Sequence, residues 1–181
     1  MQSKHIWIIA VYILLCMMLF CNRKVRLWSL LTEQIRVFRN DKEKRISLWD
    51  CICFLILPVA ISVIIVYKLG FIINNNLAEL LTTVFSFVFT VLFGFATIMI
   101  SKIDSQNKIE KQVAKETFVS IVSSTILSLI AAVLSIVLTQ AKSAICLQII
   151  SSSVVTISLI IIMLLLLITK RVFLLYVDRK D

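Results

Sequence analysis

The sequence predicts an all-α fold, namely a polytopic transmembrane helix bundle with about five membrane helices and one interfacial amphipathic helix. Apolar residues make up 60% of the 181 residues and the mean hydropathy is +1.03, whereas roughly half of a soluble domain is apolar. The chain has only two glycines and one proline. Long uncharged runs alternate with basic clusters, so residues 1–181 are expected to form a single transmembrane domain.

Five uncharged runs are the expected membrane helices. They cover residues 6–21, 51–67, 80–101, 117–141 and 143–169. A helix crosses the ~30 Å hydrocarbon layer with ~20 residues, and the first run reaches only ~24 Å. The alternative is therefore a bundle of four membrane helices, in which the first run enters the bilayer without spanning it. Pro58 lies inside the second run and lacks a backbone N–H, so a kink is expected there.

The basic residues predict the orientation of the chain. Nearly all of the 19 Lys and Arg residues lie in three segments, residues 23–50, 102–116 and 170–181. Cytoplasmic loops are enriched in Lys and Arg, so we expect two cytoplasmic loops, a cytoplasmic C-terminal tail and an external N-terminus. This orientation explains most of the net charge of +9. Anionic lipid, an acidic protein and, as the less favoured alternative, nucleic acid are the direct partners that the charge also allows.

Residues 26–39 have the periodicity of an amphipathic helix within the first cytoplasmic loop. Its apolar face consists of Leu27, Leu30, Leu31, Ile35 and Phe38. Such a helix binds the membrane surface, or it docks on a cytosolic protein. The residues expected to contact a cytosolic partner are Arg36, Arg39, Lys42, Lys44 and Arg45.

Two of the expected membrane helices carry stripes of small and hydroxylated residues. One stripe is Glu79, Thr83, Ser86, Thr90 and Gly94, and the other is Ser120, Ser124, Ser128 and Ser135. Spacings of three and four residues place each set on one helix face. Small residues let helices approach closely in lipid, so we expect these faces to pack on each other within the bundle or between subunits. The alternative is a water-filled pore lined by their hydroxyl groups.

Charged and reactive residues are scarce in the expected membrane helices. Glu79, near an outer helix end, sits among headgroups or pairs with Lys68, or it contributes to a carboxylate ring in an oligomer. No charged residue lies near the middle of a run, which argues against proton relays and ion-coupled transport. The sequence has no nucleophile, phosphate-loop or metal-ligand motif. We therefore expect no catalytic residue, no metal and no cofactor, and a protein that is not an enzyme.

Short segments between residues 30 and 140 carry a family resemblance. They are residues 37–41 (VFRND) and 44–50 (KRISLWD), the helix around Pro58, and residues 81–87 (LTTVFSF) and 92–94 (LFG). Together they resemble small bacterial membrane proteins of antiphage defence loci, such as the Kiwa membrane subunits (KwaA). The resemblance implies a homo-oligomer, specifically a tetramer, that senses perturbation of the inner membrane by phage and recruits or restrains a cytosolic effector. It carries over no catalytic residue.

Two functions from different classes follow. The first is a non-enzymatic, multi-pass sensor or scaffold of the bacterial inner membrane, which couples phage infection to a cytosolic effector. The second is an oligomeric ion channel or pore-forming effector that depolarises the membrane when it is activated. Conductance would distinguish the two, because only the second function requires a water-filled path.

Overall fold

The computed structural model describes residues 32–34, 39–40, 45–46, 52–103, 108–141 and 143–177. In this part the chain is helical apart from two strands of two residues each, the loop 69–74 and the connection between α6 and α7. The three longest helices are α5 (Asn75–Ile103), α6 (Lys108–Gln140) and α7 (Ala144–Val177). Each of these three is long and apolar enough to span a membrane. The predicted class, a helical protein suited to a membrane, is therefore confirmed.

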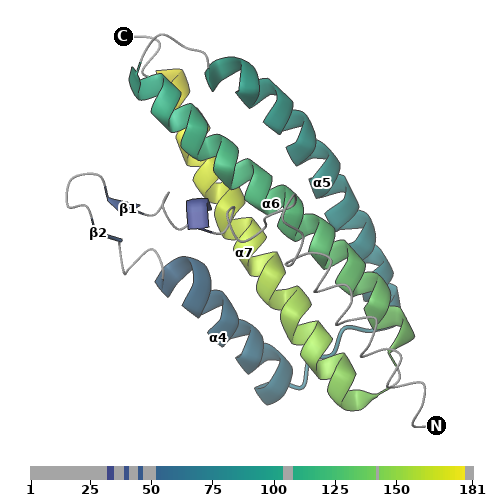
Figure 1. Cartoon of the computed structure of the whole chain (residues 1–181). Coiled ribbons are helices and arrows are strands. Elements are labelled where there is room, and N and C mark those ends of the chain that lie inside the picture. Colours follow the sequence, from purple (N-terminus) through teal and green to yellow (C-terminus); the bar gives the residue numbers. More distant parts are fainter. Residues whose placement is uncertain are drawn as a thin grey trace.

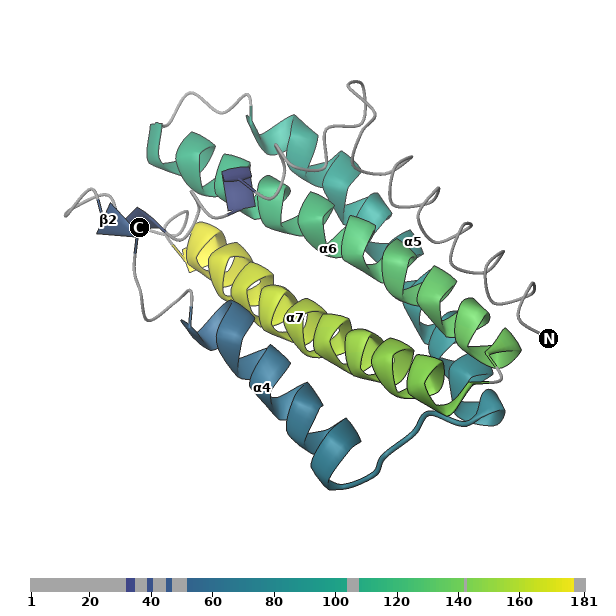
Figure 2. The same cartoon turned by 60° about the horizontal axis from the view of Figure 1, so that its bottom comes forward.

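The helices lie side by side in the spatial order α5, α6, α7 and α4 (Leu57–Val63), as Figures 1 and 2 show. Consecutive long helices run antiparallel, and α6 lies between α5 and α7. Buried apolar side chains from these three helices meet in one cluster that includes Phe85 and Val154. A second cluster, which includes Ile121 and Ile168, continues the core along the bundle. The core is thus built around α6.

The long helices extend beyond the predicted runs at one end of the bundle. α6 begins within the expected loop 102–116, and α7 continues into the expected tail 170–181. Lys, Glu and Gln are good helix formers, so a helix can continue past its apolar part. The end of α5, the start of α6 and the end of α7 come together there. This end of the bundle, here named the basic end, holds the side chains of Lys111, Lys115, Lys170 and Arg171.

The second predicted run forms a shorter helix with two widened turns. Its parts are the π-helical turn η1 (Ile52–Ile56), α4, and the π-helical turn η2 (Ile64–Lys68). Pro58 is the second residue of α4 and follows the first widened turn by one residue. A proline ring crowds the carbonyl four residues before it, and a π turn relieves this because its hydrogen bonds reach five residues back. The structure thus has a π-helical turn where a kink was expected.

Two residues define how the chain passes from this helix into α5. Gly70 adopts a left-handed backbone conformation with φ of +65°. The N–H of Phe71 then donates to the carbonyl of Ile65 at 3.2 Å, which closes the helix end. Further along, Oδ1 of Asn74 accepts a hydrogen bond of 2.9 Å from the N–H of Leu77. Asn74 is therefore the N-cap of α5.

Replacement of Gly70 by alanine is expected to destabilise the fold by about 1 kcal/mol, because a side chain disfavours positive φ. An added Cβ would meet no atom within 4 Å, so the effect comes from the backbone alone. Gly94→Ala is the matched control, since its Cβ would also meet no atom within 4 Å. Gly94 is helical, and alanine there should stabilise by up to ~1 kcal/mol. Thermal unfolding in detergent measures both variants, and shifts of the same sign would contradict the backbone explanation.

A small strand pair precedes α4. β1 (Arg39–Asn40) and β2 (Arg45–Ile46) pair antiparallel, with Arg39 opposite Ile46. Residues 32–34 are helical, but Arg39 belongs to a strand and not to the end of the expected amphipathic helix 26–39. Asn40 is a poor helix former that favours caps and turns, so a helix is not expected to continue through it. The rest of that helix and the first apolar run, 6–21, lie outside the described residues.

Candidate functional site

The hydroxyl stripe of α6 is buried inside the subunit. Ser120, Ser124 and Ser128 are fully buried, and Ser135 is 1% exposed. Their hydroxyl groups donate to carbonyl oxygens of the same helix, as Ser124 does to Ser120 at 2.9 Å. The donors are thus satisfied within α6, while the small side chains let the neighbouring helices approach closely. Within one chain the four serines are therefore buried packing residues of the bundle.

The stripe of α5 lies on the outside of the bundle. Its exposed members are Glu79, Thr83, Ser86, Thr90 and Gly94. α5 packs on α6 through another face, whose buried apolar residues are Ala78, Phe85, Leu92 and Met99. At ~100° per residue the two faces are roughly 140° apart. The expected packing of the two stripes on each other is therefore not observed, because the larger side chains of α5 give more van der Waals contact with α6.

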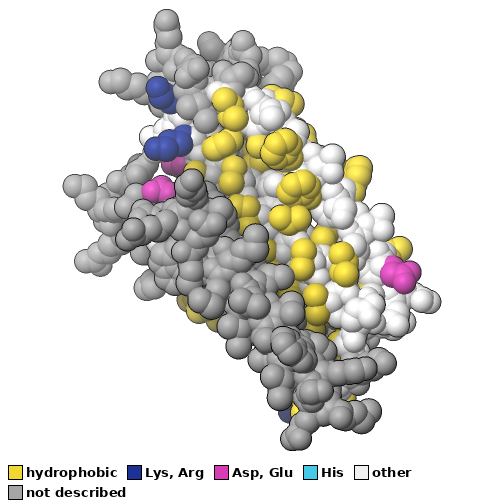
Figure 3. Space-filling view, turned by 45° about the vertical axis from the view of Figure 1, so that its right-hand side comes forward, with side chains coloured by type: hydrophobic (Ala, Val, Ile, Leu, Met, Phe, Trp, Pro, Cys, Tyr) yellow, Lys and Arg dark blue, Asp and Glu magenta, His cyan; other side chains and the backbone are white. Residues whose placement is uncertain are grey.

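The hydroxyl groups of the exposed α5 stripe are bonded within their own helix. Thr83 donates to the carbonyl of Glu79 at 3.1 Å, and Thr90 donates to the carbonyl of Ser86 at 2.9 Å. Their oxygen atoms keep lone pairs that can accept a hydrogen bond from another molecule. Figure 3 brings the α5 side of the molecule forward, and a white band of polar side chains and backbone lies there beside yellow apolar side chains. This face is therefore tolerable in lipid and also suited to close packing.

Glu79 stands at one end of the exposed stripe. Among the residues whose side chains are described, Glu116 and Arg171 form a salt bridge, whereas Glu79 and Lys68 do not. Of the interpretations given for Glu79, the ion pair with Lys68 is thus not seen. Two interpretations of Glu79 stay open, namely a position among the lipid headgroups and a carboxylate ring in an oligomer.

An ion pair joins α6 to α7 at the basic end. Nη2 of Arg171 lies 3.3 Å from Oε2 of Glu116, and Nη1 donates to Oγ of Ser120 at 3.4 Å. The Arg171 side chain is 13% exposed and that of Glu116 is 33% exposed. Sequence reasoning missed this contact, because each residue already had a local explanation as a loop or tail charge. The available signal was that both segments were expected on the same side of the membrane.

Two hydrogen bonds attach the α4 helix and the loop after it to α7. Oγ of Ser62 and Oγ1 of Thr156 are 2.6 Å apart, and the N–H of Ile73 donates to Oγ of Ser151 at 3.3 Å. Ser62 and Ser151 are fully buried. Hydrogen bonds between helices in lipid contribute about 0.6 kcal/mol each. These contacts therefore position α4 but supply little of the stability.

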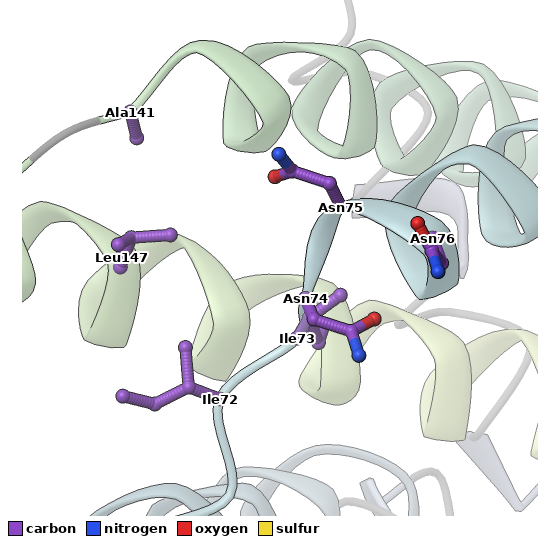
Figure 4. Close-up of a pocket in the computed structure, with 7 residues that line it drawn as sticks. All are labelled: Ile72, Ile73, Asn74, Asn75, Asn76, Ala141 and Leu147. Carbon is purple, nitrogen blue, oxygen red and sulfur yellow. The ribbon is translucent and has the colours of Figure 1, made fainter.

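A pocket of about 450 Å³ lies at the end of the bundle opposite the basic end (Figure 4). Its lining comes from the loop before α5, the first turn of α5, and the chain where α6 ends and α7 begins. The polar lining residues are Asn74, Asn75 and Asn76, of which Asn74 caps α5. None of the described lining residues has a titratable side chain, so these residues offer no group for acid–base or nucleophilic chemistry.

The predicted partner-binding residues lie in or beside the strand pair. Arg39 belongs to β1 and Arg45 to β2, and the structure describes their backbone alone. Arg36, Lys42 and Lys44 lie outside the described residues. Their role as a contact for a partner therefore stays a prediction.

Neither metal ligands nor similar proteins point to a further site in the described part of the chain. In the described part of the chain, no group of three or more His, Cys, Asp and Glu residues could hold a metal ion. No protein-family model, curated protein or solved structure matches the chain. The candidate site therefore consists of the exposed α5 face and the basic end with its interhelical ion pair.

Proposed function

We propose that this chain is a non-enzymatic sensor or scaffold of the bacterial inner membrane, which self-associates through the exposed α5 stripe. In this proposal the chain crosses the membrane five times, with its N-terminus outside and its C-terminus in the cytoplasm. The gathering of Lys111, Lys115, Lys170 and Arg171 at one end supports the orientation, because cytoplasmic ends are rich in Lys and Arg. The resemblance to Kiwa-type membrane subunits supports phage infection as the stimulus and a tetramer as the assembly.

The exposure of the α5 stripe is the observation that carries this proposal. From Glu79 to Thr97, which is also exposed, the stripe extends ~27 Å, close to the ~30 Å of the hydrocarbon layer. Between residues 80 and 100 the other exposed side chains of α5 are large and apolar, such as Phe87 and Ile98, and they suit lipid. A face of small residues at spacings of three and four lets a second helix approach closely and accept or donate hydrogen bonds. A second copy of the chain is the partner that this face fits.

The cytosolic effector is proposed to bind the basic segment around the strand pair. Arg39 pairs with Ile46, and Asn40 pairs with Arg45, so both arginines belong to the same strand pair. Two of the five predicted partner-binding residues are thus held in one small element beside the start of α4. A segment rich in basic residues favours an acidic protein surface.

Thr90→Leu is expected to weaken self-association about tenfold or more, because overpacking of a contact costs about 1–3 kcal/mol. Val91→Leu is the matched control, since Val91 is exposed on α5 beside the stripe and not within it. This control should leave the oligomer unchanged. Size-exclusion chromatography with light scattering in detergent measures the mass of each variant over a dilution series. A wild-type chain that is monomeric throughout, or a Thr90→Leu variant that associates like the wild type, would refute the proposal.

A pore lined by the same face is the second candidate function. It is favoured by the exposed hydroxyl oxygens of α5 and by the carboxylate of Glu79 at one end of the stripe. Because the α6 serines are buried, α5 would provide the lining. Planar-bilayer recordings of the purified oligomer separate the two functions. Conductance that disappears in Thr90→Leu would establish the pore, and an electrically silent oligomer would leave the scaffold.

A further inference from the structure

Arg171 and Glu116 lie where the apolar surface of the helices meets the basic end. Arg171 is within the candidate span Ala144–Phe173 of α7, and Glu116 is within the candidate span Lys111–Gln140 of α6. Both charges are therefore inside the ends of helices that are long enough to cross a membrane. Long basic side chains near the ends of membrane helices reach the headgroup layer, where they can contact lipid.

The guanidinium group of Arg171 has hydrogen-bonding capacity left over. Arginine offers five N–H donors, and within the described residues its contacts are Glu116 at 3.3 Å and Ser120 at 3.4 Å. Both distances exceed the usual 2.7–3.2 Å range of a strong N–H···O hydrogen bond. A phosphate group presents several acceptor oxygens and binds arginine through two parallel hydrogen bonds. Such a ligand can therefore satisfy Arg171 better than its present partners do.

The surroundings of Arg171 add positive charge and apolar surface. Lys115 precedes Glu116 and Lys170 precedes Arg171, and both lysines are exposed. Each member of the ion pair thus has a lysine as its neighbour in the chain. Leu167, four residues before Arg171 and so on the same face of α7, is partly exposed. Figure 3 shows dark blue basic side chains at one end of the visible face, with yellow apolar side chains beside and below them.

We propose that an anionic phospholipid binds at Arg171, where the end of α7 contacts the start of α6. Its phosphate accepts hydrogen bonds from the guanidinium in competition with Glu116, while Lys115 and Lys170 attract its net charge. Its acyl chains lie along the exposed apolar residues of α7. A zwitterionic lipid carries an ammonium group that these cations repel, so a net anionic headgroup is preferred. This inference rests on the proposed membrane location and not on self-association.

A lipid fits this position better than an acidic protein does. Arg171 is only 13% exposed and lies inside the end of a candidate span, so it is reached along the side of the bundle. A headgroup with attached acyl chains approaches from that direction, whereas a cytosolic protein meets the end of the bundle. Charge and depth together therefore favour the lipid.

Native mass spectrometry of the full-length chain tests the site, in detergent with equal amounts of phosphatidylglycerol and phosphatidylcholine of matched acyl chains. The wild type should retain phosphatidylglycerol preferentially. Arg171→Gln should reduce this retention about tenfold, because a charge-assisted contact is lost. Lys68→Gln is the matched control, since it removes one exposed positive charge from the opposite end of the bundle. It should leave the preference unchanged.

Glu116→Gln provides a test with the opposite sign. Removal of the competing carboxylate should increase the retention of phosphatidylglycerol severalfold, and this gain should vanish in the double variant Glu116→Gln/Arg171→Gln. The double variant has neither charge of the pair, so it also controls for misfolding of the single variants. A gain that persists without Arg171 would mean general electrostatic attraction and would overturn the site.

Other outcomes distinguish a failure of the lipid-site proposal from a failure of the proposed membrane location. Equal retention of both lipids by the wild type would overturn the site but agree with a membrane protein. Retention of neither lipid would contradict the membrane location itself. Displacement of phosphatidylglycerol by soluble glycerol phosphate at the same concentration would also overturn the proposal, because the acyl chains would then contribute nothing.

Discussion

Replacement of Ser124 by leucine is expected to lower the free energy of unfolding by about 3 kcal/mol, the upper part of the usual range for overpacking. Ser124 is fully buried, and so are Ser120 and Ser128 on the same face of α6. α6 contacts both α5 and α7, so the added atoms must separate helices that now touch. Titration of the folded protein with a denaturing detergent measures the difference between variant and wild type.

Two further variants isolate the packing effect. Ser124→Ala should change the stability by less than ~0.5 kcal/mol, because the hydroxyl group only bonds to the Ser120 carbonyl of its own helix. Ser86→Leu makes the same exchange on the exposed face of α5. Under monomeric conditions it should leave the unfolding free energy within ~0.5 kcal/mol. If Ser86→Leu destabilises the monomer as much as Ser124→Leu does, the assignment of inner and outer faces is wrong.

The two stripes show how much of the candidate site can be predicted from sequence. Periodicity correctly places the small residues of each helix on one face, because the spacing depends only on local helix geometry. It cannot say which face turns inward, since the stripes of α5 and α6 look alike as sequence. The answer depends on competition between faces. On α5 the large residues Phe85 and Leu92 are buried, whereas on α6 the serines are buried.

The helices were easier to predict than their details. Long apolar runs predict membrane helices directly, because length and hydropathy suffice, and three of the expected helices are present. The π-helical turn before Pro58 was predicted only as a kink, since the form of the distortion depends on how neighbouring helices accommodate it. The Glu116–Arg171 pair depends on which helices are neighbours. Tertiary geometry of that kind leaves no local signal.

Breaking the Glu116–Arg171 pair from either side is expected to cost about 1–3 kcal/mol. Loss of one partner of a fully buried pair costs roughly 3–5 kcal/mol, but Glu116 is 33% exposed, so water screens part of the effect. Glu116→Leu should cost more than Arg171→Leu, because it leaves the guanidinium, which is only 13% exposed, without its counter-ion. An arginine cannot lose its charge, whereas an unpaired carboxylate can bind a proton. The same detergent titration measures both variants.

The double variant Glu116→Leu/Arg171→Leu is expected to recover most of the lost stability, because apolar side chains then replace both charges. The coupling energy from the four proteins, wild type included, should reach about 1–2 kcal/mol. Recovery would mean that the bundle does not need the ion pair in order to fold. A double variant that folds well but loses its preference for phosphatidylglycerol would then attribute lipid binding, and not folding, to Arg171. A double variant as unstable as the single ones would instead mean that the two original side chains hold α6 and α7 together by packing.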